Sequence, residues 1–454
     1  MLRAIAPDAR RGRAMSATAL DSQGRERRKL VLAVSVGAAL EWFDFTLFAI
    51  FALQIAVAFF PASDPLMSLL ASYLALAVGF VARPLGALLM GRYADRRGRK
   101  AALTLSIMLM GAGTLIMAVC PTYEAIGWWA PLSIVVARIL QGVAAGGEIG
   151  GALAYLVETA PANRRGLFAS SQQVAQAVSF LLCGVSASLL SSVLTPAQLD
   201  EWGWRVPYVF GLLVVVAGLK IRRSLEESEP LRRFLDNQDK HAMARKGPSL
   251  RPYLPNLVMG VLIVVLWTVA TQLINFMPTY ASMVLELPRN KAYLGLVLVG
   301  LITLLCPLTA LLSDRIGRYT VMLIGAVGIA LCAYPGFVWL NNNPSLQALI
   351  SFQCGLAVLM VLYTGPASAA LAELFPVQVR ALGVSLAYAL SVTIFGSSTP
   401  TLTTLIYRQS GDPLAAAHWL FTAACLSATP LAWMCLSKSR ASSSMRIAIQ
   451  RKYE

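Results

Sequence analysis

The segment GRYADRRGRK at residues 91–100 decides how this 454-residue chain is organised. Six of its residues are charged and two are glycines, yet it lies between two long apolar segments. A short basic turn between apolar segments is typical of a cytoplasmic hairpin that joins two transmembrane helices. A weaker copy, ALLSDRIGRY, stands at residues 310–319. This recurrence predicts that the chain contains a duplicated unit.

The composition excludes a soluble globular protein. Hydrophobic residues make up 57% of the chain and charged residues 13%, whereas soluble domains carry about 25% charged residues. Continuous apolar runs also exclude a β-barrel, whose strands alternate in polarity over about ten residues. We predict an all-α polytopic membrane protein with twelve transmembrane helices, each long enough to cross about 30 Å of hydrocarbon. They lie at residues 30–60, 66–91, 101–120, 131–157, 167–194, 206–221, 253–285, 292–312, 319–340, 345–372, 383–407 and 414–437.

The net charge of +16 raises the question of a nucleic-acid partner, and its distribution answers it. Of the 38 Lys and Arg residues, 32 fall on one side of the predicted membrane and four in the loops on the other. This bias follows the positive-inside rule and predicts that both termini are cytoplasmic, in a bacterial-type cytoplasmic (inner) membrane. The basic charge therefore indicates contact with the lipid bilayer, and no nucleic-acid partner is expected.

The seven cysteines lie in or at the edges of predicted spans, without the paired spacing of a disulfide framework or a metal site. We expect no metal and no cofactor. The polar N-terminal tail before the first apolar run argues against a cleavable signal peptide. The sequence leaves two starts open, Met1 and Met15.

A second repeated string supports the duplication. ETAPANRRG begins at Glu158 and ELFPVQVRALG at Glu373, and both place Pro three residues and Arg seven residues after the Glu. The two strings are offset by nearly the same distance as the two hairpins, and both copies face the same side, which predicts parallel repeats. The expected units are a cytoplasmic tail (1–29), a six-helix bundle (30–221), a cytoplasmic linker (222–252), a second six-helix bundle (253–437) and a cytoplasmic tail (438–454).

Several motifs together resemble the major facilitator superfamily, and within it the metabolite:proton symporters that include α-ketoglutarate, citrate, shikimate and proline/betaine permeases. The matching strings are ALEWFDF (39–45), ARPLG (82–86), the hairpin at 91–100, ARILQGVAAGGEIGGALAYLVE (137–158), EWGWRVPY (201–208), RRSLEESE (222–229) and ELFPVQVRALG. The second hairpin departs from the pattern, with Ala310 in place of Gly and Tyr319 in place of a basic residue.

The resemblance implies a proton-coupled symporter that imports a small organic anion, such as a di- or tricarboxylate, by alternating access. It implies that the protein is not an enzyme, that it acts as a monomer on a small-molecule substrate and protons, and that the proton gradient drives it without a cofactor. The hairpins are then expected to gate the cytoplasmic side, although a purely topological role of their charges is the alternative. The gating candidates are Gly91, Asp95, Arg96, Gly98, Arg99, Lys100, Asp314, Arg315, Gly317 and Arg318.

Only five acidic or arginine residues fall within the predicted spans, all in the first half. Because a charge in hydrocarbon costs a few kcal/mol or more, each is a functional candidate. Their depths along the spans suggest two pairs, Asp44 with Arg138 and Arg83 with Glu148. The five residues are Glu41, Asp44, Arg83, Arg138 and Glu148.

We take Glu41, Asp44, Arg138 and Glu148 as candidates for proton coupling. Glu41 and Asp44 share one helical face, so their mutual repulsion favours protonation of at least one of them. The alternative is that these acids only hydrogen-bond to neighbouring helices. Arg138 lies in the R-x-x-Q-G pattern, for which the resemblance implies a part in proton coupling, and its guanidinium also suits a carboxylate.

Polar residues at membrane depth are candidates for lining a substrate cavity, although single polar groups in membrane bundles also serve as contacts between helices. The glycines 142, 146 and 150 in the fourth span predict close helix packing. A zwitterion such as proline or betaine is the alternative substrate, and a nontransporting nutrient sensor is the alternative of another class. The substrate-binding candidates are Arg83, Arg138, Gln172, Gln176, Gln272, Asn275, Tyr363 and Tyr388.

Overall fold

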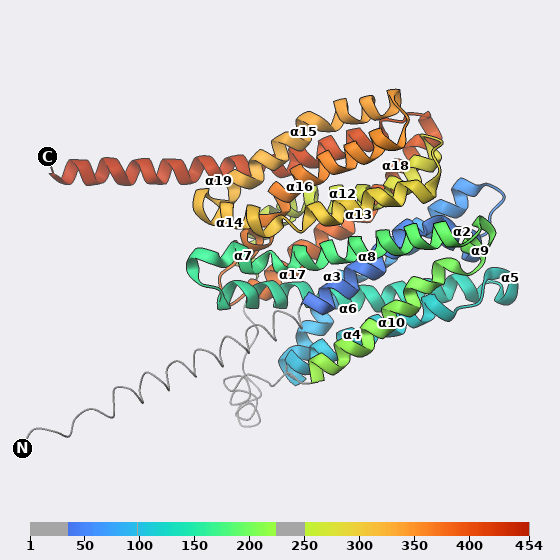
Figure 1. Ribbon diagram of the computed structural model, residues 1–454. Helices are drawn as coiled ribbons and strands as arrows, with labels where there is room; N and C mark the ends of the chain where they lie inside the picture. Colours follow the sequence, from blue (N-terminus) through green and yellow to red (C-terminus); the bar gives the residue numbers. More distant parts are fainter. Residues whose placement is uncertain (1–34, 98, 224–249, 454) are drawn as a thin grey trace, which may run out of the picture.

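A computed structural model of the protein describes residues 35–97, 99–223 and 250–453, and these ranges fold as helices joined by short connections (Figure 1). Eleven of the described helices are long and apolar enough to cross a membrane. The bent pair Ser35–Ile50 and α2 (Ala52–Phe59) raises the number to twelve when it is counted as one span. The prediction of an all-α polytopic membrane protein with twelve spans is therefore confirmed.

The two halves contain the same number of spans. After the bent pair, the first half comprises α3 (Pro65–Arg97), α4 (Arg99–Val119), α5 (Tyr123–Ile126), α6 (Trp129–Thr159), η1 (Ala162–Arg164), α7 (Arg165–Ala169), α8 (Ser171–Val193), α9 (Pro196–Glu201), η2 (Gly203–Arg205) and α10 (Val206–Arg223). The second half comprises η3 (Arg251–Tyr253), α12 (Leu254–Met283), α13 (Arg289–Thr303), α14 (Cys306–Ile316), α15 (Arg318–Asn342), α16 (Leu346–Glu373), α17 (Arg380–Ser391), η4 (Val392–Gly396), α18 (Ser398–Ser410) and α19 (Ala415–Tyr453).

Four spans that the sequence predicts as continuous are interrupted. The first bends by 69° at Phe51, the fifth breaks between α7 and α8, the eighth breaks between α13 and α14, and the eleventh contains the π-helical turn η4. Hydropathy alone could not locate the interruptions of the first, eighth and eleventh spans, because the residues there are largely as apolar as their neighbours.

The predicted polar segments lie largely outside the described residues. This holds for the tail 1–29 and for positions 224–249 of the linker 222–252. At the other end of the chain, α19 continues to Tyr453, so the predicted tail 438–454 begins as a helical extension of the last span (Figure 1).

One face of α3 shows how the sequence separates lipid from core. Leu74, Val81, Leu85 and Leu88 are all exposed, at intervals of seven, four and three residues, which places them on one side of a helix. Arg83, between them in sequence, is 2% exposed and points into the protein. Apolar side chains therefore face the lipid while the polar groups turn inward, as a membrane bundle requires.

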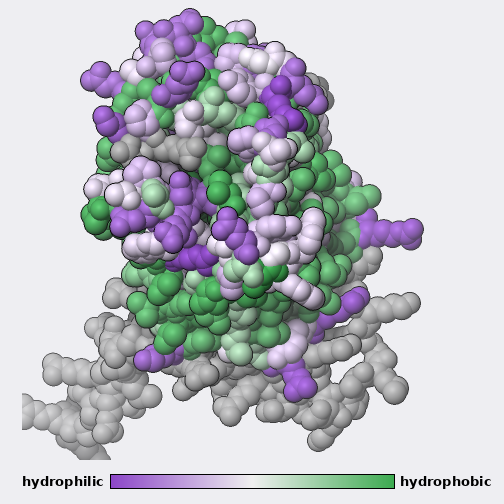
Figure 2. Space-filling model, turned by 90° about the vertical axis from the view of Figure 1, so that its right-hand side faces the viewer, coloured by the Kyte–Doolittle hydropathy of each residue, from purple (hydrophilic) through white to green (hydrophobic). Residues whose placement is uncertain are grey.

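The bundle has two ends, which we name by their connections. The hairpin end, on the left of Figure 1, carries the α3–α4 and α14–α15 turns, and the far end, on the right, carries the α2–α3 and α18–α19 connections. Figure 2 looks onto the far end, where hydrophilic side chains gather over the surface and hydrophobic ones cover the flanks. Between the halves, α8 packs on α13, α7 on α14, and α3 and α6 on α17.

The glycines of α6 permit this close packing. A Cβ atom at Gly142 would collide with the carbonyl oxygen of Gly79, and one at Gly146 with that of Arg83, both on α3. A Cβ atom at Gly150 would meet the carbonyl oxygen of Ala381 on α17, in the other half. The packing role predicted for this stripe is confirmed, and its third member lies at the interface between the halves.

We expect Gly142→Ala to lower the midpoint of thermal unfolding in detergent, because overpacking a tight contact costs about 1–3 kcal/mol. Gly151→Ala is the matched control on the same helix, since no heavy atom lies within 4 Å of its added Cβ. Equal midpoints for the two variants would contradict the packing role of Gly142.

Candidate functional site

All five acidic and arginine residues that the sequence places within the spans are buried. Glu41 and Asp44 are each 1% exposed, Arg83 2%, Arg138 0% and Glu148 8%. They come from three helices of the first half, namely Ser35–Ile50, α3 and α6. Charges at such depth require partners within the protein, so their contacts define the candidate site.

Arg83 forms an ion pair with Glu41, in which Nη1 lies 3.0 Å from Oε1. The predicted pairing of Arg83 with Glu148 is therefore wrong. Ser106 of α4 instead donates a hydrogen bond of 2.8 Å to Glu148 Oε2. The prediction failed because residue counting gives the depth of a side chain along its helix, whereas the rotation of each helix decides which side chains face one another.

Asp44 is held by neutral donors. The Thr114 hydroxyl donates to Oδ2 at 2.7 Å, and the Gln141 side-chain amide donates to the same oxygen. Arg138 lies near enough to attract the carboxylate electrostatically, but no ion pair within 4.0 Å joins the two. Asp44 and Arg138 therefore lie near each other, as their depths suggested, but they form no ion pair.

Arg138 rests on aromatic rings instead. Its Cζ atom lies 4.3 Å from the centre of the Phe48 ring and 5.6 Å from that of Phe45. None of its three guanidinium nitrogens makes a hydrogen bond of good geometry with a described residue, and the buried Tyr208 hydroxyl, which lies beside the guanidinium, makes none either. Cation–π contact compensates part of the desolvation, but unpaired donors at this depth leave Arg138 available to an anion.

A second aromatic platform holds Arg83. The Phe45 and Phe80 rings stack with centres 4.9 Å apart, and the Arg83 Cζ lies 4.5 Å from one centre and 4.9 Å from the other. The Tyr388 hydroxyl of α17 approaches the same guanidinium. Arg83 thus lies where the first half meets the second.

The second half contributes aromatic and amide groups. Tyr388 packs edge-on against Trp267 of α12, with ring centres 5.3 Å apart. Asn275 donates to Gln272 at 3.3 Å within α12. The substrate-binding candidates Gln172, Gln176, Gln272, Asn275, Tyr363 and Tyr388 are all buried.

The candidates for lining the substrate cavity fall into two groups, according to whether their polar atoms have hydrogen-bond partners. Tyr363 donates a 2.6 Å hydrogen bond to the carbonyl of Ile263 within its own half, which favours a structural role. In contrast, buried polar atoms without a hydrogen-bond partner among the described residues occur on Gln172, Gln176, Asn275 and Trp267. Such atoms are costly unless a ligand or water satisfies them, so they are the stronger candidates.

Trp267, Thr114 and the Phe45–Phe80 platform were missed by sequence reasoning, which searched for charges and amides. A tryptophan in the middle of an apolar span was the available signal for Trp267, because its N–H needs a partner at that depth. Nothing in the sequence singled out one phenylalanine among the 17 in the chain.

At the hairpin end, the second hairpin contacts the first half. Asp314 accepts hydrogen bonds from the backbone N–H groups of Gly166 and Leu167, at 3.0 and 3.3 Å. It also lies 3.4 Å from Arg318, whose Nε is 2.7 Å from Glu373. Gly317 adopts a φ of 104°, which only glycine takes readily, whereas Arg315 is exposed.

The repeated strings pair crosswise between the halves. Arg380 of the second string lies 2.9 Å from Glu158 of the first, and Arg165 of the first lies 3.8 Å from Glu373 of the second. Each acid of one copy thus meets the arginine of the other.

The first hairpin is only partly described. Gly91 is exposed, with open space around an added Cβ, so close packing does not require glycine there. Gly98 and the side chains of Asp95, Arg96, Arg99 and Lys100 lie outside the described part of the chain. Their gating role stays a prediction.

The halves also meet at the far end. Arg408 of α18 lies 2.7 Å from Asp64, in the connection before α3. Deeper in the bundle, the Tyr73 hydroxyl of α3 donates to Thr279 of α12 at 3.2 Å. Contacts thus join the halves at both ends, and the five charged residues are buried between these ends.

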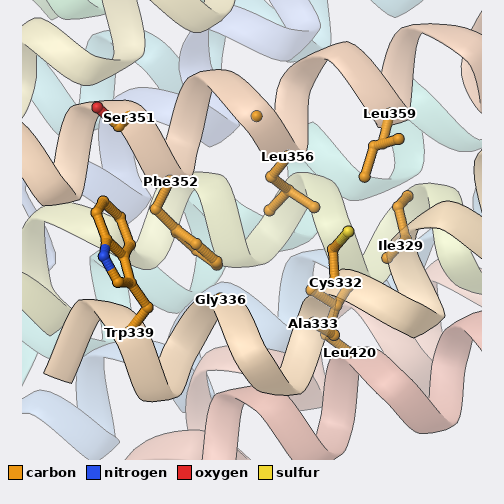
Figure 3. A pocket seen from close by; sticks show the side chains of 11 residues that line it. Ile329, Cys332, Ala333, Gly336, Trp339, Ser351, Phe352, Leu356, Leu359 and Leu420 are labelled. Carbon is orange, nitrogen blue, oxygen red and sulfur yellow. The ribbon is translucent and has the colours of Figure 1, made fainter. Parts of the chain in front are cut away.

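A cavity of about 250 Å³ lies elsewhere, between α15 and α16 of the second half (Figure 3). Its lining is nearly all apolar, with Trp339, Phe352, Leu356 and Leu359 among its side chains. It offers no charged group to an organic anion. Across the described ranges, no cluster of three His, Cys, Asp or Glu residues is arranged to hold a metal.

Comparison with known proteins agrees with this architecture. A citrate-proton symporter from Klebsiella pneumoniae is 34% identical over 426 residues, which cover 92% of this chain and 95% of that protein. A protein named "Putative proline/betaine transporter" from Staphylococcus aureus (strain COL) is 30% identical over 404 residues, covering 87% and 85%.

The solved structure of the xylose transporter XylE from E. coli matches with a TM-score of 0.69 at 17% identity, covering 89% of this chain and 98% of that one. At this identity the match shows the fold alone, which in XylE is that of the major facilitator superfamily. The family model described as "Sugar (and other) transporter" matches residues 30–252 and 226–436. The chain therefore belongs to the sugar (and other) transporter family and has the major facilitator fold.

Proposed function

We propose that this protein is a proton-coupled symporter that imports a small organic anion, of the di- or tricarboxylate type, by alternating access. The observation that carries the proposal is the buried group of acids and arginines in the first half, which faces polar and aromatic side chains of the second. Such a group can exchange both a proton and an anion. The similarity to a citrate-proton symporter over nearly the whole chain supports the same class of substrate.

Asp44 and Arg138 form the proposed proton site. The Asp44 Oδ1 atom has no hydrogen-bond partner in the described chain, while Oδ2 accepts from Thr114 and Gln141. A proton can therefore bind at Oδ1 and leave both existing hydrogen bonds intact. Protonation neutralises the negative charge closest to Arg138, whose unpaired donors then attract an anion more strongly. Protonation of Asp44 before the anion binds to Arg138 therefore couples proton movement to substrate transport.

Glu148 is a second place for the proton in this proposal. It is buried and accepts a hydrogen bond from Ser106, and its negative charge adds to that of Glu41 nearby. Uptake of a proton by either acid would relieve this repulsion.

Alternating access follows from the contacts at the two ends. The crosswise pairs Glu158–Arg380 and Arg165–Glu373 close the hairpin end, and Asp64–Arg408 closes the far end. Rocking of the halves would break the ion pairs at one end of the bundle while those at the other end remain. The hairpins, including Asp95 of the first, are proposed as the gate on the cytoplasmic side.

The protein is a multi-pass membrane protein. We place it in the bacterial inner membrane, with both termini cytoplasmic and with the boundaries 1–29, 30–221, 222–252, 253–437 and 438–454 for tails, halves and linker. It is proposed to act as a monomer, with a small molecule and protons as partners and the proton gradient in place of a cofactor.

A zwitterion such as proline or betaine is the second candidate substrate. The relative named as a proline/betaine transporter supports it, and the aromatic platforms beside Arg83 and Arg138 would suit a quaternary ammonium group. A nontransporting sensor would bind the same molecules without flux.

Uptake into proteoliposomes tests the function. With an inward proton gradient we expect accumulation of labelled citrate above its external concentration, and a protonophore should remove the accumulation. Competition by α-ketoglutarate, proline and betaine then ranks the substrates. Binding of citrate without uptake would favour the sensor, and uptake that ignores the protonophore would disprove proton coupling.

Asp44→Asn should abolish uptake driven by the proton gradient, because an amide does not take up a proton in this pH range. Exchange of internal for external citrate should persist, since it needs no net proton movement. Asp200→Asn, at an exposed aspartate of α9, is the control and should transport normally. Full gradient-driven uptake by Asp44→Asn would exclude Asp44 as the proton site.

Glu373→Gln should loosen the hairpin end, because it removes the partner of both Arg318 and Arg165. Partly exposed ion pairs contribute up to about 1 kcal/mol, so opening should rise by about fivefold. The measurement is the rate at which a soluble maleimide labels Ser368→Cys, a fully buried position near this end, in a background without native cysteines. Glu201→Gln should leave the rate unchanged, and an unchanged rate in Glu373→Gln would argue against the gate.

A further inference from the structure

We infer that Arg83 binds a carboxylate group of the substrate, and that Glu41 is the internal carboxylate with which the substrate exchanges on this arginine. The inference rests on the proposed function, since it assumes that the protein transports a carboxylate. It adds a specific binding residue and a second link between substrate and proton.

The ion pair between Arg83 and Glu41 is incomplete. Both side chains are almost fully buried, at 3% and 2% exposure, and one contact of 3.0 Å joins Nη1 to Oε1. Neither Glu41 oxygen makes a well-aligned hydrogen bond, and Arg83 Nε has no partner among the described residues. A guanidinium binds a carboxylate best through two parallel hydrogen bonds. Glu41 therefore leaves part of the binding capacity of Arg83 unused.

Two aromatic rings hold the Arg83 guanidinium in place without consuming its donors. Phe45 and Phe80 contact it through their rings, with centres 4.5 and 4.9 Å from Cζ. Ring contact stabilises the charge and leaves the N–H groups at the edge of the guanidinium free for hydrogen bonds. A carboxylate could then approach in the plane of the guanidinium.

The second half supplies the other side of this position. Tyr388 approaches the Arg83 guanidinium and packs against Trp267. The Trp267 Nε1–H is buried and has no hydrogen-bond partner among the described residues, so it is a second donor for the same ligand. A carboxylate on Arg83 would contact both halves.

Arg138 is less suited to binding a substrate carboxylate that contacts both halves. Its aromatic contacts, Phe45 and Phe48, and the neighbouring Asp44 and Tyr208 all belong to the first half. Arg83, in contrast, lies beside α17 of the second half. Binding at Arg83 can therefore influence how the halves are arranged, while Arg138 acts on the proton.

Replacement of Glu41 by a substrate carboxylate on Arg83 changes the balance of charge around Glu41. The groups that face Glu41 are Arg83 from α3, Glu148 from α6 and Tyr388 from α17, and Asp44 lies one turn away on the same helix. A substrate carboxylate on Arg83 would leave an ionised Glu41 without its cation and beside Glu148. Binding therefore requires that Glu41 take up a proton, which predicts that substrate and proton bind together.

Calorimetric titration of the purified protein in detergent, from pH 6 to 8, tests the inference. The probes are citrate, α-ketoglutarate and betaine, with choline as the analogue of betaine that lacks the carboxylate. Wild-type affinity for α-ketoglutarate should fall as pH rises, by up to about tenfold per unit. Glu41→Gln should reduce this dependence to the part that Asp44 contributes and bind about tenfold more tightly at pH 8, because no ionised acid competes for Arg83.

Arg83→Lys should bind every carboxylate probe at least about tenfold more weakly, because lysine cannot form the bidentate pair. Tyr388→Phe, which keeps the ring against Trp267, should weaken binding by about threefold. Glu124→Gln, at an exposed glutamate of α5, should match the wild type. Thermal unfolding midpoints establish that each variant is folded, and Glu41→Gln carries the test if Arg83→Lys is not.

The outcomes separate this inference from the proposed function. Wild-type affinity in Arg83→Lys, or an unchanged pH dependence in Glu41→Gln, would overturn the exchange even if uptake remains proton-driven. Loss of binding in Arg83→Lys together with uptake that ignores the proton gradient would retain the carboxylate site and refute the coupling. Equal affinity for choline and betaine, or a wild type that binds none of the carboxylates, would overturn the inference itself.

Discussion

The rest of the structure depends on the burial of charge in a region that water does not reach. A charged side chain at the centre of a bilayer costs several kcal/mol or more unless the protein surrounds it with partners. Here five such side chains lie within one half of the bundle, and helices, aromatic rings and neutral donors are arranged around them. Close packing of α3 on α6, which the glycines of α6 allow, brings Arg83 and Arg138 within reach of the acids on the first helix.

The contacts that compensate these charges are unevenly distributed. Asp44 has two neutral donors on one oxygen and none on the other, and Arg138 has aromatic rings but no hydrogen bond of good geometry with a described residue. A group built only for stability would saturate its hydrogen bonds, since unsatisfied ones cost free energy. Buried polar atoms without hydrogen-bond partners are expected at a site where protons and ligands bind and dissociate.

Much of the fold could be predicted from the sequence, because the spacing of apolar runs, the bias of Lys and Arg and the two repeated strings each depend only on local composition. The identity of the buried charges was predictable for the same reason. Their pairing was not: Arg83 meets Glu41 instead of Glu148, since helix rotation depends on packing across the whole bundle. Trp267 and the Phe45–Phe80 platform were not predicted, because aromatic side chains are common in any membrane span.

The crosswise pairing of Glu158 with Arg380 and of Glu373 with Arg165 has a consequence for how the two halves are joined at the hairpin end. In an interface with two-fold symmetry, residue i of one subunit contacts residue j of the other, and j contacts i. The two strings meet in this way although they belong to one chain. A homodimer of a single six-helix unit would form both ion pairs from one copy of the string, so a single motif suffices to join two such units at this end.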